Sequence, residues 1–249
     1  MIEQSTYYYR LAEWTLLEEL YANKWTATSS VNYSVKPYSV CQTTGRLDAE
    51  YYQPKYDVLF EKLSHYHCNT ISEIATIKKS IEPGSDAYCD SGVPFVRVSD
   101  ITKRGISKPN IFLSRTEYNV EELRPKKDTI LLSKDGSIGI AYKVEDDMDC
   151  ITSGALLHLN VYNKKYLPDY LTLVLNSLVV RLQAERDSNG AIIQHWKPSE
   201  IEQVVIPYLP IETQRIIVSK VQQSFALRSE SKHQLEQAKQ LVEQEIENH

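Results

Sequence analysis

The chain has 249 residues, of which 42% are hydrophobic, and a formal net charge of −5. This length accommodates one substantial core and an accessory element. The acidic balance excludes a sequence-blind, strongly basic nucleic-acid binder, although a locally basic surface remains compatible with specific binding. No apolar run approaches the roughly 18 residues of a membrane span. We therefore expect neither a membrane segment nor a signal peptide.

Cysteine spacing bears on metal binding and on cell compartment. Cys41, Cys68, Cys89 and Cys150 are widely separated and form no CxxC pair. This pattern argues against a zinc site and favours reduced thiols, either in the core or on the surface. Together with the lack of a targeting signal, it predicts a cytoplasmic protein.

The first third of the chain predicts two helices and a connector. Apolar residues recur at helical spacing over 5–21, which indicates a short amphipathic helix. Residues 22–44 are rich in Thr, Ser, Asn and Tyr, as is typical of an extended connector. A second helix is predicted from 56 to about 66, after Pro54.

Short strands are predicted over most of the segment from Ile71 to Ile211. Gly and Pro interrupt the apolar runs at the intervals expected of an irregular β-rich domain. One helix is expected within this segment, at about 168–185. The predicted strands are ISEIATI, VPFVRVSDI, DTILLSKDG, GIAYKV and ALLHLNV.

The last part of the chain predicts a polar loop, a short helix near Pro198, a strand at 204–206 and a long helix from about 211 to 247. A helix of about 35 residues is roughly 50 Å long. Its apolar residues fall close to alternating three- and four-residue steps, so this stripe needs a partner helix. The partner is either the helix at 5–21, in this chain or in a second copy, or the same helix of a second copy. The candidate dimerisation residues are Val218, Val221, Phe225, Leu235, Val242 and Ile246.

This order of features resembles the target recognition domain and following helix of a type I restriction-modification specificity subunit. Together the similar segments cover most of residues 45–230. They are GRLDAEYYQPKYDVLFEKL (45–63), which resembles the lead-in to such a domain, LLSKDGSIG (131–139), its strand and glycine turn, SGALLHLNV (153–161), the next strand, and LPDYLTLVLNS (167–177), its buried helix.

Contacts to DNA are expected from polar side chains on loops, because Arg and Lys hold phosphates whereas Arg, Lys, Asn, Gln and Ser read base edges. Arg97 has an alternative role as a structural partner of Asp100. Lys134 and Ser137 are candidate DNA-contacting residues if the KDGSIG turn faces DNA. The other candidates are Lys78, Lys79 and Ser80 in a first loop, Arg97, Ser99, Lys103 and Arg104 in a second, and Ser188, Asn189, Gln194, His195 and Lys197 in a third.

The distribution of charge also suggests a DNA-facing surface. Between residues 97 and 143 the basic residues exceed the acidic ones by about four, and an acidic segment, VEDDMD, follows at 144–149. We expect the acidic segment to lie apart from the basic one, so that one face meets phosphates. The alternative is an ordinary solvated face of mixed charge.

Residue patterns that signal catalysis are missing from the sequence. KDGSIG lacks a following GK[ST], so we expect a tight turn between strands and not a phosphate-binding loop. His195, His65 and His67 have no carboxylate cluster at metal-ligand spacing. No glycine-rich S-adenosylmethionine loop and no amino-methylation motif occur, and the acidic-x-Lys triplet at 230–232 lacks the strand of a nuclease site. We expect neither a catalytic residue nor a bound metal.

We therefore expect an α+β fold, in which a β-rich target recognition domain lies between a short N-terminal helix and a long coiled-coil-type C-terminal helix. The expected divisions are 1–45 for the N-terminal helix and connector, 46–210 for the recognition domain and 211–249 for the dimerisation or spacer helix. Where the family has two recognition domains, this chain has one. It is therefore either a half-length subunit that dimerises or a fragment of a longer one.

The resemblance implies a non-catalytic specificity subunit that reads one half of a bipartite site in double-stranded DNA. It also implies docking to an adenine methyltransferase (modification) subunit, a restriction subunit in the same complex, and S-adenosylmethionine, ATP and Mg on those partners, with no cofactor on this chain. Two alternatives remain. One is the recognition module of a single-chain restriction-methylation enzyme, and the other is a helix-mediated scaffold without DNA binding.

Overall fold

The computed structural model of the chain forms two compact units. The first combines Met1–Lys24 with Pro210–His249, and the second is the intervening segment, Trp25–Leu209. The N-terminal and C-terminal helices therefore pack in one unit. The predicted division into functional regions at residues 45 and 210 is a different matter and stays a prediction. The structure describes residues 1–21, 33–188 and 194–247.

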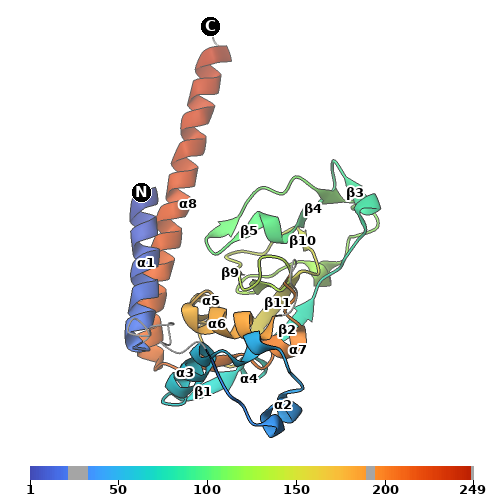
Figure 1. The fold of residues 1–249 in the computed structure, drawn as a ribbon. Coiled ribbons are helices and arrows are strands. Elements are labelled where there is room, and N and C mark those ends of the chain that lie inside the picture. Colours follow the sequence, from blue (N-terminus) through green and yellow to red (C-terminus); the bar gives the residue numbers. More distant parts are fainter. Residues whose placement is uncertain (22–32, 189–193, 248–249) are drawn as a thin grey trace. The chain divides into compact units, whose positions relative to one another are not determined.

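The helical unit consists of α1 (Ile2–Glu19) and α8 (Ile211–Glu247), which lie side by side in opposite directions (Figure 1). Both helices bury an apolar face between them, because side chains three and four residues apart share one side of a helix. A buried serine pair also joins them, in which Ser224 Oγ donates to the Ser5 carbonyl at 2.6 Å. The buried residues include Tyr9, Ala12 and Leu16 of α1, Leu20 directly after it, and Ile217, Val218 and Val221 of α8.

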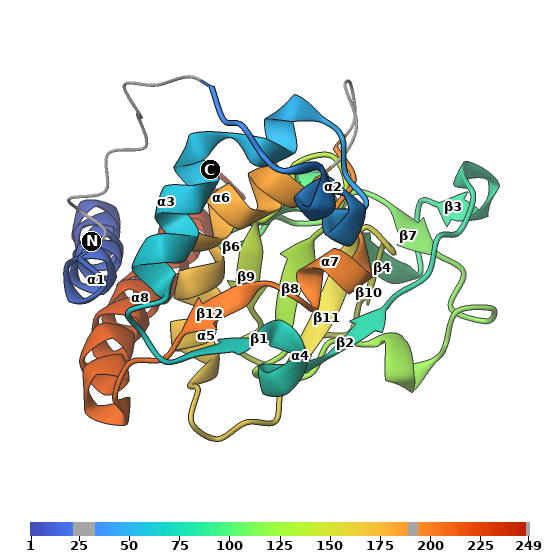
Figure 2. The same cartoon turned by 60° about the horizontal axis from the view of Figure 1, so that its bottom comes forward.

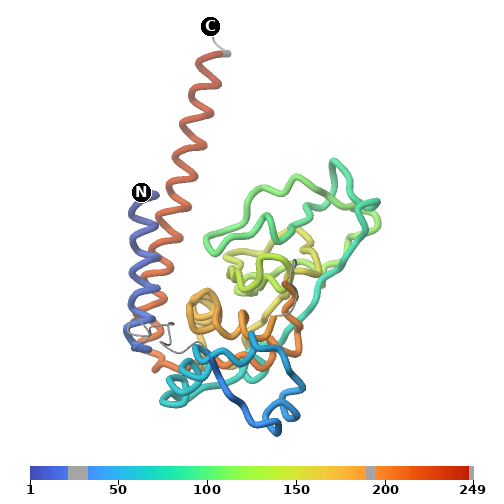
Figure 3. Tube along the Cα trace, viewed as in Figure 1, coloured from blue at the N-terminus to red at the C-terminus, as the bar shows by residue number. Residues whose placement is uncertain are grey.

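The predicted apolar stripe of α8 is divided into two halves. Val218 and Val221 are buried, and Phe225 contacts the Tyr9 ring at a centroid distance of 6.3 Å. This half is covered by α1 of the same chain, so the expectation that it pairs with α8 of a second copy is wrong. Beyond it, α8 continues past the start of α1 (Figure 3). Large apolar side chains of this outer half are exposed. They include Leu235, Leu241, Val242 and Ile246.

The second unit is built on a four-stranded antiparallel sheet, in the order β2-β11-β8-β9. The strands are β2 (Ala75–Lys79), β8 (Ile130–Ser133), β9 (Ala141–Lys143) and β11 (Leu156–Val161). All four residues of β8 are buried, and so are the first four of β11. Consecutive apolar residues therefore mark the two central strands, since a strand covered on both faces needs no polar alternation.

Three helices lie against this sheet or against one another (Figure 2): α3 (Pro54–Leu63), α5 (Pro168–Leu175) and α6 (Leu178–Asp187). The prediction of a single helix at about 168–185 is wrong, because residues 176–177 separate α5 from α6. Asn176 lies at this break, and its side chain bonds to the backbone of Ala141 in β9. Its Nδ2 donates to the Ala141 carbonyl at 2.8 Å, and its Oδ1 accepts from the Ala141 N–H at 3.1 Å. Ser177 after it has an extended backbone, with φ −83° and ψ 167°, which ends the helical run.

The apolar residues of ISEIATI predicted a single strand, and this prediction is wrong. The segment begins with α4 (Ile71–Ile74) and becomes β2 only at Ala75. The N–H of Thr70 donates to the Glu73 carboxylate at 2.8 Å, which is part of a capping box that starts the helix. The sequence Thr-x-x-Glu was a signal for this turn of helix that the apolar pattern concealed.

A second, four-stranded sheet has the order β10-β4-β7-β3. The expected strand VPFVRVSDI is shorter than predicted, because the N–H of Arg97 donates to Asp100 Oδ2 at 2.9 Å and turns the chain. The strands are β3 (Tyr88–Cys89), β4 (Val93–Val96), β7 (Phe112–Leu113) and β10 (Ile151–Thr152), and β5 (Ile101–Thr102) and β6 (Gly105–Ile106) form a separate hairpin.

The remaining elements connect these parts. Part of the expected connector 22–44 is helical, because α2 covers Tyr38–Thr44, whereas 22–32 lie outside the described residues. β1 (Cys68–Thr70) pairs with β12 (Val205–Pro207) in antiparallel fashion. The short helix expected near Pro198 is confirmed as α7 (Pro198–Ile201). One-turn helices occur at Ala49–Tyr52, Ser85–Ala87, Val98–Asp100 and Glu121–Leu123.

The predicted fold class is confirmed: the structure is α+β, with an N-terminal helix, a β-rich centre and a long C-terminal helix. Within the described part of the chain, no helix combines the length and the apolar content of a membrane span.

Candidate nucleic-acid interface

The KDGSIG segment forms a tight turn between β8 and β9, as predicted. Gly136 and Gly139 have φ angles of 72° and 79°, a left-handed conformation that favours glycine. Ser133 Oγ donates to the Ser137 carbonyl at 2.6 Å and fixes the turn from inside. The exposed positions Gly136 and Ser137 thus lie at the end of a buried, well-held strand pair.

The polar segment before α7 lies directly on this turn. The N–H of Gly136 donates to the Gln194 carbonyl at 3.0 Å, and the N–H of Trp196 donates to the Lys134 carbonyl at 2.8 Å. The Trp196 side chain is 1% exposed and anchors the segment in the core. Residues 134–137 and 194–197 together are called the turn–loop cluster below. Asn189, also predicted to contact DNA, lies outside the described residues.

One carboxylate joins the two halves of the turn–loop cluster. Asp135 forms a β-bridge with His195, and its Oδ1 lies 2.8 Å from His195 Nδ1. Its Oδ2 is paired with the Lys134 ammonium group. Burial alone would raise the pKa of Asp135, but the hydrogen bonds from Lys134 and His195 prevail and lower it. The sequence analysis missed Asp135, since nothing in the sequence relates two residues that are 60 positions apart.

The first predicted loop is in fact the end of a strand. Lys78 and Lys79 belong to β2 and are exposed, whereas Ser80 is buried. The Lys78 ammonium group donates to the Glu122 carbonyl. Lys79 pairs with Leu157 at the start of β11, and Leu156 pairs with Ser133 at the end of β8. The strand register therefore places Lys79 and the turn–loop cluster at the same end of the sheet.

The second predicted loop follows β4 and continues into the β5–β6 hairpin. Arg97 Nε lies 3.6 Å from Asp100 Oδ2, so the structural partnership weighed for Arg97 is present. Ser99 Oγ also donates to Asp100, at 3.3 Å. Lys103 and Arg104 form the turn between β5 and β6.

Residues 153–155, called the linking segment below, connect these predicted DNA-contacting loops. Each residue of the linking segment shares a backbone hydrogen bond with a residue within or next to a different predicted DNA-contacting segment, so three regions of the sequence are held together. The hydrogen bonds run from Ser153 N to Val96 O at 2.9 Å, from Gly154 N to Ile81 O at 2.7 Å and from Lys134 N to Ala155 O at 2.9 Å.

The prediction that the acidic segment 144–149 lies apart from the basic segment 97–143 is wrong. The acidic segment 144–149 folds back on the basic one, because the N–H of Lys127 donates to Asp147 at 2.9 Å and the N–H of Met148 to the Pro125 carbonyl at 3.0 Å. Much of the local positive charge is therefore neutralised within the chain. The ion pairs are Arg115–Asp149, Arg124–Glu121, Arg124–Asp149, Lys126–Glu121, Lys126–Asp147, and those of Lys143 with Asp128, Glu145 and Asp169.

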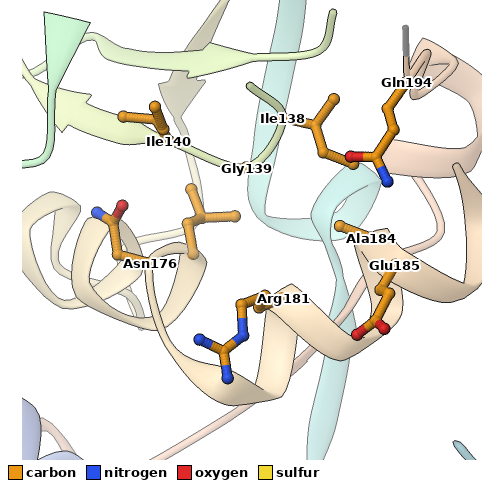
Figure 4. A pocket seen from close by; sticks show the side chains of 9 residues that line it. Ile138, Gly139, Ile140, Asn176, Arg181, Ala184, Glu185 and Gln194 are labelled. Atoms are coloured by element: carbon orange, nitrogen blue, oxygen red, sulfur yellow. The ribbon is translucent and has the colours of Figure 1, made fainter. Parts of the chain in front are cut away.

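A pocket of about 500 Å³ lies beside the turn–loop cluster (Figure 4). It contains no arrangement of nucleophile and base, and Asn176 in its wall is engaged with the backbone of Ala141. Among the residues that the structure describes, no group of three or more metal-binding side chains occurs. The pocket is lined by Ile138, Gly139, Ile140, Leu175, Asn176, Arg181, Ala184, Glu185 and Gln194.

The cysteines also agree with the sequence analysis, because all four are free thiols. Burial raises the pKa of Cys68 to about 11. It likewise raises the pKa of Cys150 to about 12. Neither thiol is therefore activated as a nucleophile, since the thiolate is the reactive form.

Comparison with known proteins identifies the family. The model of the type I restriction modification DNA specificity domain matches residues 65–240, more than half of the chain. The chain belongs to this specificity-domain family. The matched region begins before β1 and ends within α8, so it includes the turn–loop cluster and the linking segment.

Individual relatives agree with the family. The EcoBI specificity subunit of a type I restriction enzyme from Escherichia coli is 24% identical over 160 residues, which are 64% of this chain and 33% of that protein. The HsdS subunit from Thermoanaerobacter tengcongensis has a TM-score of 0.50 at 16% identity, over 93% of this chain and 46% of that one. The type IIG restriction endonuclease BpuSI has a TM-score of 0.52 at 12% identity, over 74% and 30%. The two solved structures are similar in fold alone.

The chain thus spans 33% of the curated relative and 46% of the HsdS chain. The family is one of specificity subunits, which are not catalytic and in general hold no cofactor of their own, and this confirms the prediction of a non-catalytic component.

Proposed function

We propose that this chain reads one half of a bipartite DNA site through the end of the central sheet that carries the turn–loop cluster. The convergence of the predicted loops supports this proposal most directly, because the linking segment holds them together by backbone hydrogen bonds. Phosphate contacts would position the chain on the duplex, and the polar side chains of the cluster would read base edges. Lys79, Lys103, Arg104 and Lys197 suit the first role, and Ser137, Gln194 and His195 the second.

We further propose that the chain docks an adenine methyltransferase subunit and, through the assembled complex, a restriction subunit. S-adenosylmethionine, ATP and Mg would then be bound by those subunits, in the cytoplasm. The family's specificity role supports this division of labour.

Dimerisation through the outer half of α8 is part of the same proposal. Leu235 and Val242 are 57% and 59% exposed and one heptad apart, so a helix without a partner leaves them in water. The chain also corresponds to about half of the HsdS subunit in length. Antiparallel pairing with a second copy would bury these residues and supply a second recognition domain. Two identical copies require an inverted-repeat site.

The single-chain alternative, a recognition module of a restriction-methylation enzyme, has the fold similarity to BpuSI in its favour. Co-purification with a separate methyltransferase would argue against it. If the chain is a scaffold without DNA binding, a gel-shift experiment should show no retarded DNA, even with the methyltransferase added.

The decisive experiment is to map methylated adenines in cells that carry the intact system, with and without this chain. We expect methylation at one bipartite sequence only when the chain is present. Methylation that is unchanged without the chain would refute the proposed function. The purified chain alone should transfer no methyl group from S-adenosylmethionine to DNA.

A further inference from the structure

The two ring nitrogens of His195 have different surroundings. Nδ1 lies 2.8 Å from Asp135 Oδ1. The side chain is 62% exposed, and within the described part of the chain no hydrogen bond engages Nε2. One nitrogen is therefore held by the protein, whereas the other is presented to solvent at the surface proposed to face DNA.

Asp135 determines which nitrogen carries the proton. An ionised carboxylate can only accept hydrogen bonds, so Nδ1 beside it must be the protonated nitrogen. The lowered pKa of Asp135 keeps this carboxylate ionised. Lys134 engages the other oxygen, Oδ2, and thereby fixes the carboxylate in its orientation. In a neutral ring, Nε2 is then an acceptor.

We propose that His195 is a specificity-determining residue that reads a DNA base through Nε2 as a hydrogen-bond acceptor. Among the exocyclic groups in the major groove, adenine N6 and cytosine N4 are donors, whereas guanine O6 and thymine O4 are acceptors at the corresponding places. His195 therefore selects adenine or cytosine at one position of the site. Asp135 and Lys134 are positioning residues, because they act through the tautomer of His195. This inference rests on the proposed DNA-reading function.

The substitution Asp135→Asn separates this role from a merely structural one. Lys134 can only donate, so the amide oxygen of the new side chain turns towards Lys134 and its NH2 group towards His195. Nδ1 then becomes the acceptor and Nε2 the donor. The base preference at the position read by His195 should consequently change from adenine or cytosine to guanine or thymine. Lost packing or a disordered loop would weaken binding without inverting the preference.

The test selects sites from a library of randomised duplexes with the full chain, in complex with its methyltransferase subunit. Wild type, Asp135→Asn, His195→Ala and the control Ser199→Ala, an exposed position on α7, are compared at about pH 8, where imidazole side chains in general are neutral. Nitrogen-15 NMR of histidine-labelled chain, with His195→Ala to assign the signal, reports the tautomer without DNA.

We expect wild type and Ser199→Ala to select adenine or cytosine at one position, by a factor on the order of five to ten. His195→Ala should lose selection there and keep it elsewhere, and Asp135→Asn should invert it. NMR should show the Nδ1–H tautomer in wild type and Nε2–H in Asp135→Asn. If Asp135→Asn does not fold, His195→Gln replaces it, and its amide, both donor and acceptor, should broaden the preference.

Two results would overturn the inference: His195→Ala or His195→Gln selecting like wild type at every position, or an Nε2–H tautomer in wild type. Failure of the proposed function has a different signature. In that case wild type selects no base at any position, although the NMR signal still reports the Nδ1–H tautomer.

Discussion

His158 Nε2 lies 2.7 Å from the hydroxyl of Thr152, and both side chains are buried. Thr152 belongs to β10 and His158 to β11, so this hydrogen bond joins the two four-stranded sheets. Burial, together with the nearby positive charge of Lys78, lowers the pKa of His158 from 6.5 to about 4. The ring is therefore neutral in the folded protein at physiological pH.

This lowered pKa predicts a loss of stability in mild acid. The unfolded chain binds a proton at His158 below about pH 6.5, whereas the folded chain does so only near pH 4, so the free energy of unfolding falls as the pH falls between these values. From pH 7 to pH 4.5 we expect this residue to contribute a loss of about 2 kcal/mol. Urea unfolding of wild type and His158→Gln across this range measures it. Equal losses in both proteins would contradict the prediction.

The bridge between Asn176 and Ala141 predicts a strong effect of Asn176→Ala. The substitution leaves the N–H and the carbonyl of a buried residue without their partners, at a cost on the order of 2–3 kcal/mol. Asn176→Asp should cost more, because a carboxylate would face the Ala141 carbonyl. Chemical denaturation checks both, with the exposed Ser199→Ala as a control that should unfold like wild type. A wild-type midpoint for Asn176→Ala would contradict the prediction.

Substitution of Lys103 or Arg104 by Ala should weaken DNA binding whatever the sequence. If each holds a phosphate, its loss should reduce the slope of log affinity against log salt by about 1. Titrations at several salt concentrations, with the methyltransferase-bound chain, measure this slope. Thr116→Ala, which alters an exposed and uncharged position, is the control. Unchanged slopes for both variants would place the phosphate contacts elsewhere.

Gln194→Ala should alter the sequence preference of DNA binding and not its salt dependence. It should relax the sequence preference by about 1–3 kcal/mol if Gln194 makes a bidentate base contact, with little change in the salt slope. The same prediction applies to Asn189. Competition between the cognate site and single-base variants is the measurement. A uniform loss on all sequences would instead identify Gln194 as a residue that positions the backbone.

The exposed half of α8 predicts self-association at micromolar concentration. The double substitution Leu235→Asp, Val242→Asp should convert a dimer into a monomer, because it puts two carboxylates into the apolar stripe. Gln237→Asp, Gln240→Asp adds the same charge to α8 outside the stripe and should leave the dimer intact. Sedimentation equilibrium decides the matter: equal masses for wild type and the stripe variant would reject the helix-mediated dimer.

Much of the fold was predictable because local patterns carry it. The apolar runs of β8 and β11, the glycine turn between β8 and β9, and the long α8 were all visible in the sequence. The errors arose where a polar side chain redirects the backbone. Asn176 lies at the break between α5 and α6, Glu73 caps a turn of helix inside an apolar run, and Asp100 ends the expected strand after β4.

The sequence proposed members of the candidate site, whose DNA contacts stay a prediction, but it did not reveal how they assemble. Loop chemistry identified Lys134, Ser137, Gln194 and His195, whereas the contact that joins them passes through Asp135, which looked like an ordinary acidic residue. The strand register determines which residues lie opposite one another in a sheet, and no local sequence pattern reveals this register. For the same reason, the return of Asp147 and Asp149 onto the basic segment could not be foreseen from their position in the chain.

The linking segment has an evolutionary consequence. Its three hydrogen bonds use only main-chain atoms, so they do not depend on which side chains the neighbouring loops carry. Substitutions at exposed loop positions can then alter the bases that are selected while the loops keep their places. A Cβ at Gly154 would lie 2.9 Å from Glu82 Oε1 and 3.2 Å from Lys79 Cε, so these two flexible side chains would have to move to admit a larger residue. Under the proposed function, a scaffold of this kind allows the DNA target to change by a few surface substitutions, without a new fold.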